Sequence, residues 1–524
     1  MRDPNPLIRL TLFCWAVAVC SLAIAQPAPV LTWITNSSLK LEQIIGDVDW
    51  AALAQGTNLP TTSQTVTRFH ILGTDNGGSF EDNGKLIVLF GDTIADTNIW
   101  EYHAADPLSW STNTDGDSGL LLNFYTNRPY AFLRNTAVFV QPSGIVMAGN
   151  DVPKCGIVLS NGAFIICNTG SDPNNTNNPH ASDYSILVTF NESNLLTLTN
   201  TYLATNLIFS TNRIISALNT NLAPTNPEQG HFIFTSLHEF GTNVVMFGTG
   251  EFRASDIYLS LTPTANFLSG QGTLYFTGLT NGQPSWSSFE SNSVPVVQDN
   301  PTQGPSWPND IPSAGDLSVV NPPGLGLWLM TFDGGRNMGR TKQTEGVYFS
   351  YSPAPWGPWT EPQLIFNPKR DGGRGVFIYD ATNHTGPAGP VINPSQNNPT
   401  NTAGAVYGPY LIERFTRITN STLFIYYTMS TWNPYTVVKM RSAFSITPVI
   451  DPGSLVKAKK KFSFAWSAPT NITYQVDYSS NLLSGWGTFT NIITSTNGTF
   501  NFTDNGTNSG GFGNTKFYRL RTSP

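Results

Sequence analysis

The sequence predicts an all-β fold, a five-bladed β-propeller followed by a small C-terminal β-sandwich. Aromatic residues are abundant, with 13 Trp, 18 Tyr and 32 Phe, and they are accompanied by 46 Gly and 37 Pro. Aromatic residues favour strands, whereas Gly and Pro mark the turns between strands. A short apolar run that ends in small or polar residues also recurs along the chain, as expected of strands buried on both faces.

Five of these apolar runs fall in the main part of the chain, and we expect them to be the innermost strands of five blades around a central axis. They cover residues 86–92, 145–151, 244–250, 327–333 and 423–430. Their spacing is uneven, so the chain is not a strict sequence repeat. A large β-sandwich or a β-helix would contain similar runs, and both folds remain open on this pattern alone.

The order of segments predicts five parts. Turn-forming residues at 447–453 and a basic cluster at 457–461 separate a long β-rich region from a shorter one. We expect the shorter region to serve in sorting, surface attachment or carbohydrate contact. The five parts are a signal peptide at 1–25, an irregular N-terminal entry segment at 26–65, a propeller catalytic domain at 66–446, a linker at 447–461 and a small β-sandwich at 462–524.

The first residues have the features of an export signal. Arg2 and Arg9 supply positive charge, residues 10–25 are almost wholly apolar, and Ala23–Ala25 offers small residues for cleavage. A membrane anchor is the alternative, but the apolar run is short for a bilayer span. We therefore expect an exported protein, secreted or held at the cell surface or in the periplasm, with no integral membrane segment after cleavage.

Charge limits the classes of partner. Charged residues make up 12% of the chain, about half the usual share of roughly 25%, and the net charge is −7. Such a chain is a poor candidate for binding nucleic acid. The six histidines show no metal-ligand spacing, so no metal and no cofactor are expected. We expect a monomer whose partner is a polysaccharide.

Two cysteines remain after removal of the signal peptide. Cys155 and Cys167 flank a segment in which Asn161-Gly162 lies between two apolar runs, which is a hairpin signal. The two sulfurs would then lie opposite each other, and export makes a disulfide chemically reasonable. We expect a cross-strand disulfide between Cys155 and Cys167.

Two aspartates are the candidate catalytic residues. Asp92 follows the apolar run Lys85–Phe90 directly, and Asp75 lies upstream in the turn Gly73–Gly77. One hairpin would place these two carboxyl groups on neighbouring turns, facing each other across a cleft, which is the arrangement that glycoside hydrolysis requires. Aspartates beside glycine more often cap their own turns, and this alternative stays open on local sequence.

Several short strings stand out in the middle and at the end of the main domain. They are Phe252–Ser255, Tyr275–Gly278, Gly315–Val319, Ser352–Trp359, Tyr407-Gly408 and Ser430–Tyr435. In this order they closely resemble the domain-of-unknown-function family 4185, over about residues 66–444. The resemblance implies a five-bladed propeller similar to those of arabinan- and fructan-cleaving enzymes. Some members of this family are endo-D-arabinanases, grouped as glycoside hydrolase family 183.

The resemblance also implies that Asp75 and Asp92 are the catalytic pair. The family usually has Leu where Asn76 stands, and Glu is frequent at the position of Asp316. We place Asp75 as nucleophile or base and Asp92 as acid. Aromatic side chains are suited to stacking on sugars, and polar ones to holding hydroxyl groups. The predicted substrate-binding residues are Asp316, Arg253, Tyr407, Trp432, Asn433, Tyr435 and His180.

The function predicted from these features is that of a secreted glycoside hydrolase that cleaves furanosidic links in a polysaccharide as an endo-acting, D-arabinanase-like enzyme. One alternative is a non-catalytic polysaccharide-binding propeller, although a binder would not need both Asp75 and Asp92. Another is a propeller lyase or sialidase. A sialidase would need a tyrosine nucleophile and an arginine cluster, for which the scattered arginines give little support.

Overall fold

The computed structural model describes residues 28–95, 106–127, 136–137, 150–169, 184–190, 204–208, 230–250, 255–297, 314–334, 345–392, 398–512 and 515–523. Three predictions lie outside the described residues: the signal peptide at 1–25, Arg253 and His180. Within the described residues, no helix is long and apolar enough to cross a membrane.

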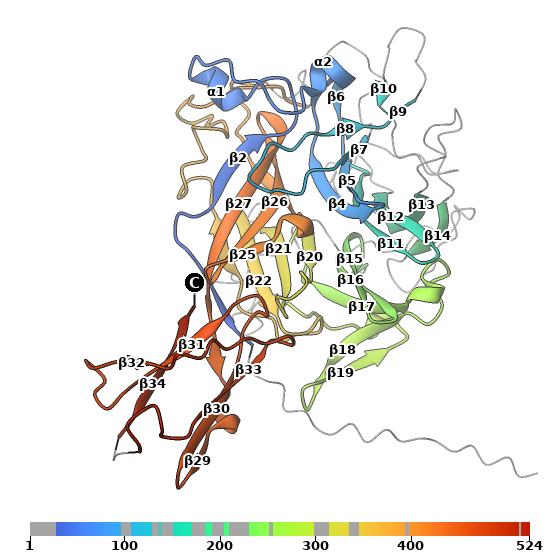
Figure 1. Ribbon diagram of the computed structural model, residues 1–524. Coiled ribbons are helices and arrows are strands. Elements are labelled where there is room, and N and C mark those ends of the chain that lie inside the picture. Colours follow the sequence, from blue (N-terminus) through green and yellow to red (C-terminus); the bar gives the residue numbers. More distant parts are fainter. Residues whose placement is uncertain are drawn as a thin grey trace, which may run out of the picture.

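The described chain is nearly all β, as the sequence predicts (Figure 1). Two short α-helices precede the main sheets, α1 (Trp50–Ala54) and α2 (Thr65–Phe69). Helix α1 begins at Asp49, whose carboxylate accepts hydrogen bonds from the amides of Ala51 and Ala52. The remaining helical turns are the 3-10 helices η3 (Thr264–Asn266), η4 (Glu290–Asn292), η5 (Glu413–Phe415) and η6 (Pro452–Ser454).

Antiparallel sheets follow one another along the chain, and the first three take their strands in sequence order. The first contains β4 (Asn76–Asp82), β5 (Lys85–Phe90), β7 (Leu108–Ser111) and β8 (Asn123–Phe124). The second contains β11 (Pro153–Leu159), β12 (Gly162–Thr169), β13 (Tyr184–Phe190) and β14 (Ala204–Ile208). The third contains β15 (Phe234–Phe240), β16 (Asn243–Thr249), β17 (Tyr258–Pro263), β18 (Leu274–Thr280) and β19 (Gln283–Ser287).

Two further sheets complete the main domain. The fourth contains β20 (Leu317–Val320), β21 (Trp328–Gly334), β22 (Gly346–Ser352) and β23 (Gln363–Phe366). The fifth contains β24 (Val406–Leu411), β25 (Arg417–Thr419), β26 (Thr422–Trp432), β27 (Tyr435–Thr447), β1 (Val30–Trp33) and β2 (Leu39–Gln43). Two small pairs lie beside these sheets, β3 (Ile71–Gly73) with β6 (Ile94–Ala95), and β9 (Thr126–Asn127) with β10 (Thr136–Ala137).

The first main-domain strand of each sheet lies at the centre of the molecule. Strand β4 contacts β11, β11 contacts β15, β15 contacts β20, β20 contacts β24, and β24 contacts β4 again. The contacts therefore close into a ring. The starts of these strands gather at one end of the ring, because the Lys154 ammonium of β11 lies 3.3 Å from the Asn76 side chain of β4 and 5.0 Å from the Phe234 ring of β15.

The prediction that the apolar runs are innermost strands was wrong for the four runs that the structure describes. Four of the runs form the second strands β5, β16, β21 and β26, while the run at 145–151 lies mostly outside the described residues. A second strand is hydrogen-bonded on both edges and covered by neighbouring sheets on both faces, so every residue of β21 is buried. The inner strands are free to carry polar residues toward the axis.

The prediction that the entry segment at 26–65 is irregular was wrong, because this segment contains two regular strands. Strands β1 and β2 both pair antiparallel with β27, near the end of the main domain. Figure 1 shows this blue segment running beside orange β27. The pairing covers an edge of β27 that would otherwise be left open, and it ties the beginning of the domain to its end.

The predicted disulfide is contradicted by the structure. Cys155 and Cys167 are both buried and both free. The hairpin turn pairs Leu159 with Gly162, and this register places Ile166 opposite Cys155. A bulge between Pro153 and Cys155 then places Cys167 opposite Pro153. The cysteines are thus not a cross-strand pair, and Cys155 Sγ lies instead 3.3 Å from the Thr235 hydroxyl of β15.

The C-terminal region forms two small sheets around an aromatic core. One sheet contains β28 (Val449–Ile450), β29 (Val456–Ala458), β30 (Lys461–Ser467) and β33 (Thr499–Asp504). The other contains β31 (Tyr474–Ser479), β32 (Gly487–Thr488) and β34 (Phe517–Thr522). The expected linker at 447–461 therefore supplies strands rather than a flexible connection. Trp466 and Phe500 share one buried cluster with Leu327 of the main domain, so the two regions pack together.

Candidate active site

Two turns are locked together at the end of the first sheet. Asp75 precedes β4 and Asp92 follows β5, so the β4–β5 hairpin brings them side by side. The Gly91 amide donates to the Asp75 carbonyl oxygen at 3.0 Å, and the Thr74 hydroxyl donates to the Gly91 carbonyl oxygen at 2.8 Å. The Thr93 hydroxyl donates to Thr74 Oγ1 at 3.1 Å. The backbone of both candidate acids is therefore held rigidly.

Gly91 leaves room for the Asp75 carboxylate. A Cβ atom at position 91 would lie 2.3 Å from Asp75 Oδ1 and 2.2 Å from Asn76 Nδ2. Real Cβ atoms do not come that close to other heavy atoms. The carboxylate of Asp75 thus lies directly over the turn that carries Asp92.

The Asp75 carboxylate is half-buried and accepts hydrogen bonds at both oxygens. The Tyr407 hydroxyl donates to Oδ2 at 3.0 Å, and the Asn76 amide nitrogen donates to Oδ1 at 3.0 Å. Burial raises the pKa of Asp75 to about 6, although the positive charge of Lys154 and hydrogen bonds from Tyr435 and Tyr407 oppose this rise. Asp75 is therefore ready to ionise near neutral pH.

Asp92 is more deeply buried, with 6% of its surface exposed. Its Oδ2 accepts a 3.1 Å hydrogen bond from the Asn150 amide, while Oδ1 has no hydrogen-bond partner among the described residues. Burial and then the neighbouring Asp75 charge raise the pKa of Asp92 to about 7. Asp92 thus holds its proton to a higher pH than Asp75, and the two carboxyl groups differ in the way that acid and base roles require.

A third carboxyl group, Asp106, was missed in the sequence. It is 1% exposed, and within the part of the chain that the structure describes neither of its oxygens has a hydrogen-bond partner. Burial, followed by the charges of Asp92 and Asp75, raises the pKa of Asp106 well above its usual value. The Phe90 amide donates to the Pro107 carbonyl oxygen at 3.1 Å and keeps this segment beside the strand leading to Asp92. In the sequence, an Asp before a proline indicates only a turn.

Asp316 lies in a buried ion pair rather than at an open sugar-contact position. Its Oδ1 lies 2.7 Å from Lys154 Nζ and accepts from the Tyr410 hydroxyl at 3.0 Å. Lys154 and Asp316 are 4% and 2% exposed. Lys154 was also missed, although a lysine between Val152 and Cys155 in an apolar strand of a charge-poor chain was a usable signal. The pair places one cation close to the acids.

The four predicted contact residues of the fifth sheet have different surroundings. Tyr407 donates to Asp75, while the fully buried Tyr435 donates to the Asp92 carbonyl oxygen at 3.0 Å. Trp432 is half-buried and packs edge-on against Tyr435, with ring centroids 5.7 Å apart. Trp432 is therefore the ring best placed to stack on a sugar, whereas Tyr435 holds the backbone of Asp92 in place through its hydrogen bond.

Asn433 does not lie at a sugar-contact position. It is fully buried, and its side-chain nitrogen donates to the carbonyl oxygens of Pro399 and Thr402 at 2.8 and 2.6 Å. Its side-chain oxygen accepts from the Gly389 amide at 3.2 Å. Asn433 therefore anchors the long connection between β23 and β24 beneath the turn that carries Trp432.

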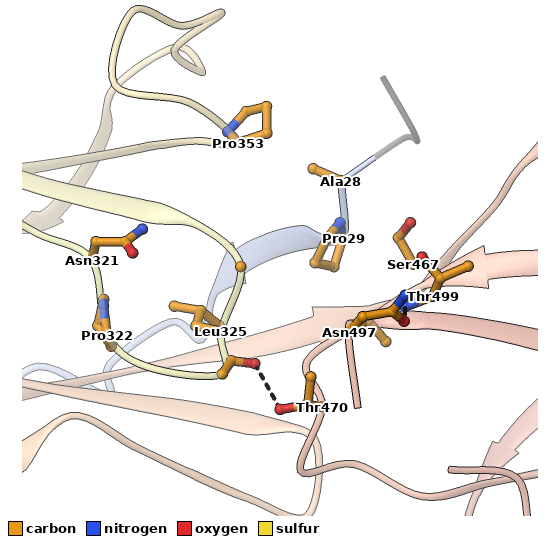
Figure 2. A pocket seen from close by; sticks show the side chains of 14 residues that line it. Ala28, Pro29, Asn321, Pro322, Leu325, Pro353, Ser467, Thr470, Asn497 and Thr499 are labelled. Atoms are coloured by element: carbon orange, nitrogen blue, oxygen red, sulfur yellow. Dashed lines mark hydrogen bonds between the residues drawn. The ribbon is translucent and has the colours of Figure 1, made fainter. Parts of the chain in front are cut away.

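Neither a metal site nor the cleft beside the C-terminal region offers an alternative active site in the described part of the chain. Among the described residues, no group of three or more His, Cys, Asp or Glu side chains could hold a metal ion. A cleft of about 420 Å³ lies between the main domain and the C-terminal region, where the Thr470 hydroxyl donates to the Gly324 carbonyl oxygen at 3.3 Å (Figure 2). The cleft is lined by Ala, Pro, Gly, Leu, Asn, Ser and Thr residues, without a titratable side chain, so it offers no acid or base.

These features define an all-β protein with a ring of antiparallel sheets and a cluster of buried acids at one end of the ring. The chain belongs to the family described as domain of unknown function DUF4185, whose sequence profile matches residues 61–441. No curated protein sequence matches the chain.

Among solved structures, the chain is similar to glycoside hydrolases. A family 43 glycoside hydrolase, YxiA from Bacillus licheniformis, is 10% identical with a TM-score of 0.36, covering 81% of this chain and 84% of that one. An endo-1,5-alpha-L-arabinanase from Thermotoga petrophila is 10% identical with a TM-score of 0.36, covering 83% and 92%. An alpha-L-arabinanase from Penicillium chrysogenum, complexed with arabinobiose, is 9% identical with a TM-score of 0.33, covering 77% and 98%. At TM-scores this low, the likenesses carry no weight for the chemistry of this chain.

Proposed function

We propose that this protein is a glycoside hydrolase that cleaves furanosidic links in a polysaccharide, acting as an endo-D-arabinanase-like enzyme. The observation that carries the proposal is the pair Asp75 and Asp92, held on two interlocked turns with pKa values raised to about 6 and about 7. Glycoside hydrolysis needs one carboxyl group that is protonated and one that is ionised at the same pH. The arabinan preference comes from the family resemblance given above.

The two carboxyl groups take different roles. Asp92 is the acid that protonates the leaving oxygen, because it is the more buried and keeps its proton to a higher pH. Asp75 is the nucleophile or base, because the Tyr407 hydroxyl and the Lys154 charge both favour its ionised form. Tyr435 and Tyr407 are positioning residues in this scheme, since each donates a hydrogen bond to one of the two aspartate residues.

The proposal includes a specific architecture. We infer a five-bladed propeller, because the inner strands β4, β11, β15, β20 and β24 contact one another in a closed cycle. The two small sheets after residue 447 are inferred to be a β-sandwich that shares part of its core with the main domain. A polymer lying across the end of the ring would meet Asp75, Asp92 and the half-buried Trp432 in one region.

The setting follows from the sequence. We propose that residues 1–25 direct export, because a charged start, an apolar run and small residues follow one another there. An exported enzyme would meet polysaccharide outside the cytoplasm. The partner proposed is therefore the polysaccharide itself, with the protein acting as a monomer and without a cofactor.

The experiment is a panel of polysaccharides incubated with the full-length mature protein, with reducing ends and product sizes measured over time. Arabinans, fructans and galactofuranans form the panel, and the Asp75→Asn/Asp92→Asn double variant is the blank. Cleavage of an arabinan into a series of oligosaccharides supports the proposal. If a polysaccharide binds but no member of the panel is cut, the non-catalytic binding function replaces it.

A further inference from the structure

His231 lies outside the cluster of acids but at the same end of the ring. It comes three residues before Phe234, the first residue of β15. The Phe234 ring lies 5.0 Å from Lys154 Nζ, and Lys154 in turn contacts Asn76 and Asp316 at the starts of β4 and β20. The start of β15 therefore faces the same side as the acids.

Three interactions fix the His231 ring in place. It lies flat on the Tyr258 ring, with centroids 3.8 Å apart and an interplanar angle of 2°. Its Nδ1 lies 2.7 Å from the Ser293 hydroxyl, and its backbone amide donates to Glu290 Oε1 at 2.8 Å. Glu290 is itself 1% exposed, so the anchor is rigid. A histidine held in this way is preorganised for a contact rather than free to rotate.

The second ring nitrogen faces no fixed partner. No hydrogen bond to His231 Nε2 is present in the described part of the chain, and the residue is half-buried rather than enclosed. Burial lowers the pKa of His231 to about 4, so the ring is uncharged at neutral pH. An uncharged ring nitrogen beside a flat aromatic pair matches a sugar hydroxyl, which both donates and accepts hydrogen bonds.

We propose that His231, held on Tyr258, is a distal contact for the glycan, where Nε2 binds a hydroxyl group of a neutral sugar unit away from the unit being cleaved. The inference rests on the proposed function, because it assumes a polymer lying across the end of the ring. It adds a second binding position in the third sheet to the acids carried by the first. It also predicts a preference for uncharged glycans, since the ring offers no positive charge to a carboxylate.

The test is the dependence of KM on oligosaccharide length. In His231→Ala, KM for long oligosaccharides should rise about tenfold, the loss expected for one hydrogen bond, while kcat and the pH profile stay unchanged. For the shortest oligosaccharide that is still cleaved, KM should change less than about twofold because the distal position is empty. Binding of long oligosaccharides to the inactive Asp75→Asn protein, with and without His231→Ala, should show the same loss.

His238→Gln is the matched control, because His238 lies within β15, the strand that His231 precedes, but packs edge-on against Trp328 and contacts Glu413. It should leave both KM values unchanged. If His231→Ala fails to fold, Tyr258→Leu removes the platform and keeps the Glu290 anchor, and it should raise KM for long oligosaccharides only.

The outcomes separate this inference from the proposed function. Equal effects on short and long oligosaccharides, or none, overturn the role of His231 while leaving the acids in place. If no glycan is cleaved but binding of a polysaccharide falls in His231→Ala, the hydrolase proposal fails and the contact stands. If no polysaccharide binds, both proposals are overturned.

Discussion

Lys154 Nζ lies 2.7 Å from Asp316 Oδ1, with both side chains almost fully buried at the centre of the ring of inner strands. Among the described residues, this cation therefore lies among several buried acids, and its charge opposes the rise in the pKa of Asp75 and of Asp92. The ion pair links the second and fourth sheets and sets the electrostatics of the candidate acids in the first.

Removing the cation alone should be costly. In Lys154→Met, Asp316 stays buried without its partner, and we expect a loss of about 3–5 kcal/mol in the free energy of unfolding, measured with urea. The double variant Lys154→Met/Asp316→Asn should recover most of this loss, because it leaves no unpaired charge. A double variant as unstable as the single one would show that the ion pair is not the cause.

We expect Gly91 to be essential for the rate of hydrolysis but not for the folding of the rest of the protein. In Gly91→Ala, the new Cβ would force the Asp75 carboxylate and the Asn76 amide to move, and a misplacement of about 1 Å lowers kcat/KM on the order of 100-fold. Gly453→Ala, in an exposed turn before β29, is the control and should keep full activity. Near-normal kcat/KM in Gly91→Ala would argue against a tight Asp75 geometry.

Tyr407→Phe should move the acidic limb of the pH profile. The lost hydroxyl stabilises ionised Asp75, so its removal raises the pKa of Asp75, and the rise of kcat/KM with pH should occur at higher pH. The loss of rate at pH 5–6 should be on the order of tenfold, because a hydrogen bond to a charged group contributes about 1.5–3 kcal/mol. A uniform loss at every pH would indicate a packing role instead.

Asp92 should destabilise the folded protein at high pH. Its folded-state pKa of about 7 is above the value of about 3.9 for an unfolded chain, so its contribution to stability is complete below about pH 4 and is lost as the pH rises through 7. The melting temperature of Asp92→Asn, relative to the native protein, should therefore increase between pH 5 and pH 8. A constant difference would mean that Asp92 titrates normally.

The all-β class and the neighbouring positions of Asp75 and Asp92 could be predicted because local patterns carry them. A hairpin between Asp75 and Asp92 follows from one apolar run and two Gly-marked turns, and the structure interlocks those turns. The position of the apolar runs in second strands could not be predicted, because a run buried on both faces looks the same in either place.

Other parts of the site depend on contacts between distant segments. Asp106 precedes β7 of the first sheet, whereas Lys154 lies in the second sheet and Tyr410 in the fifth, and no local pattern in the sequence joins them. The disulfide prediction failed for a local reason, since the turn pairs Leu159 with Gly162 and this register places Ile166 rather than Cys167 opposite Cys155. The sequence did not indicate His231 as a sugar contact, because the residues that hold its ring, Tyr258 and Ser293, lie 27 and 62 residues further along the chain.

The central claim is that Asp92 is the acid and Asp75 the nucleophile or base, and a substrate whose leaving group needs no proton tests it most directly. We would compare kcat/KM of Asp92→Asn and Asp75→Asn on the natural polysaccharide and on a dinitrophenyl glycoside of the same sugar. Circular dichroism would check that each variant is folded. Both variants should lose on the order of 100- to 10,000-fold on the polysaccharide. On the dinitrophenyl glycoside, Asp92→Asn should regain most of its rate and Asp75→Asn should not. A folded Asp75→Asn protein with near-full activity on either substrate would contradict the account.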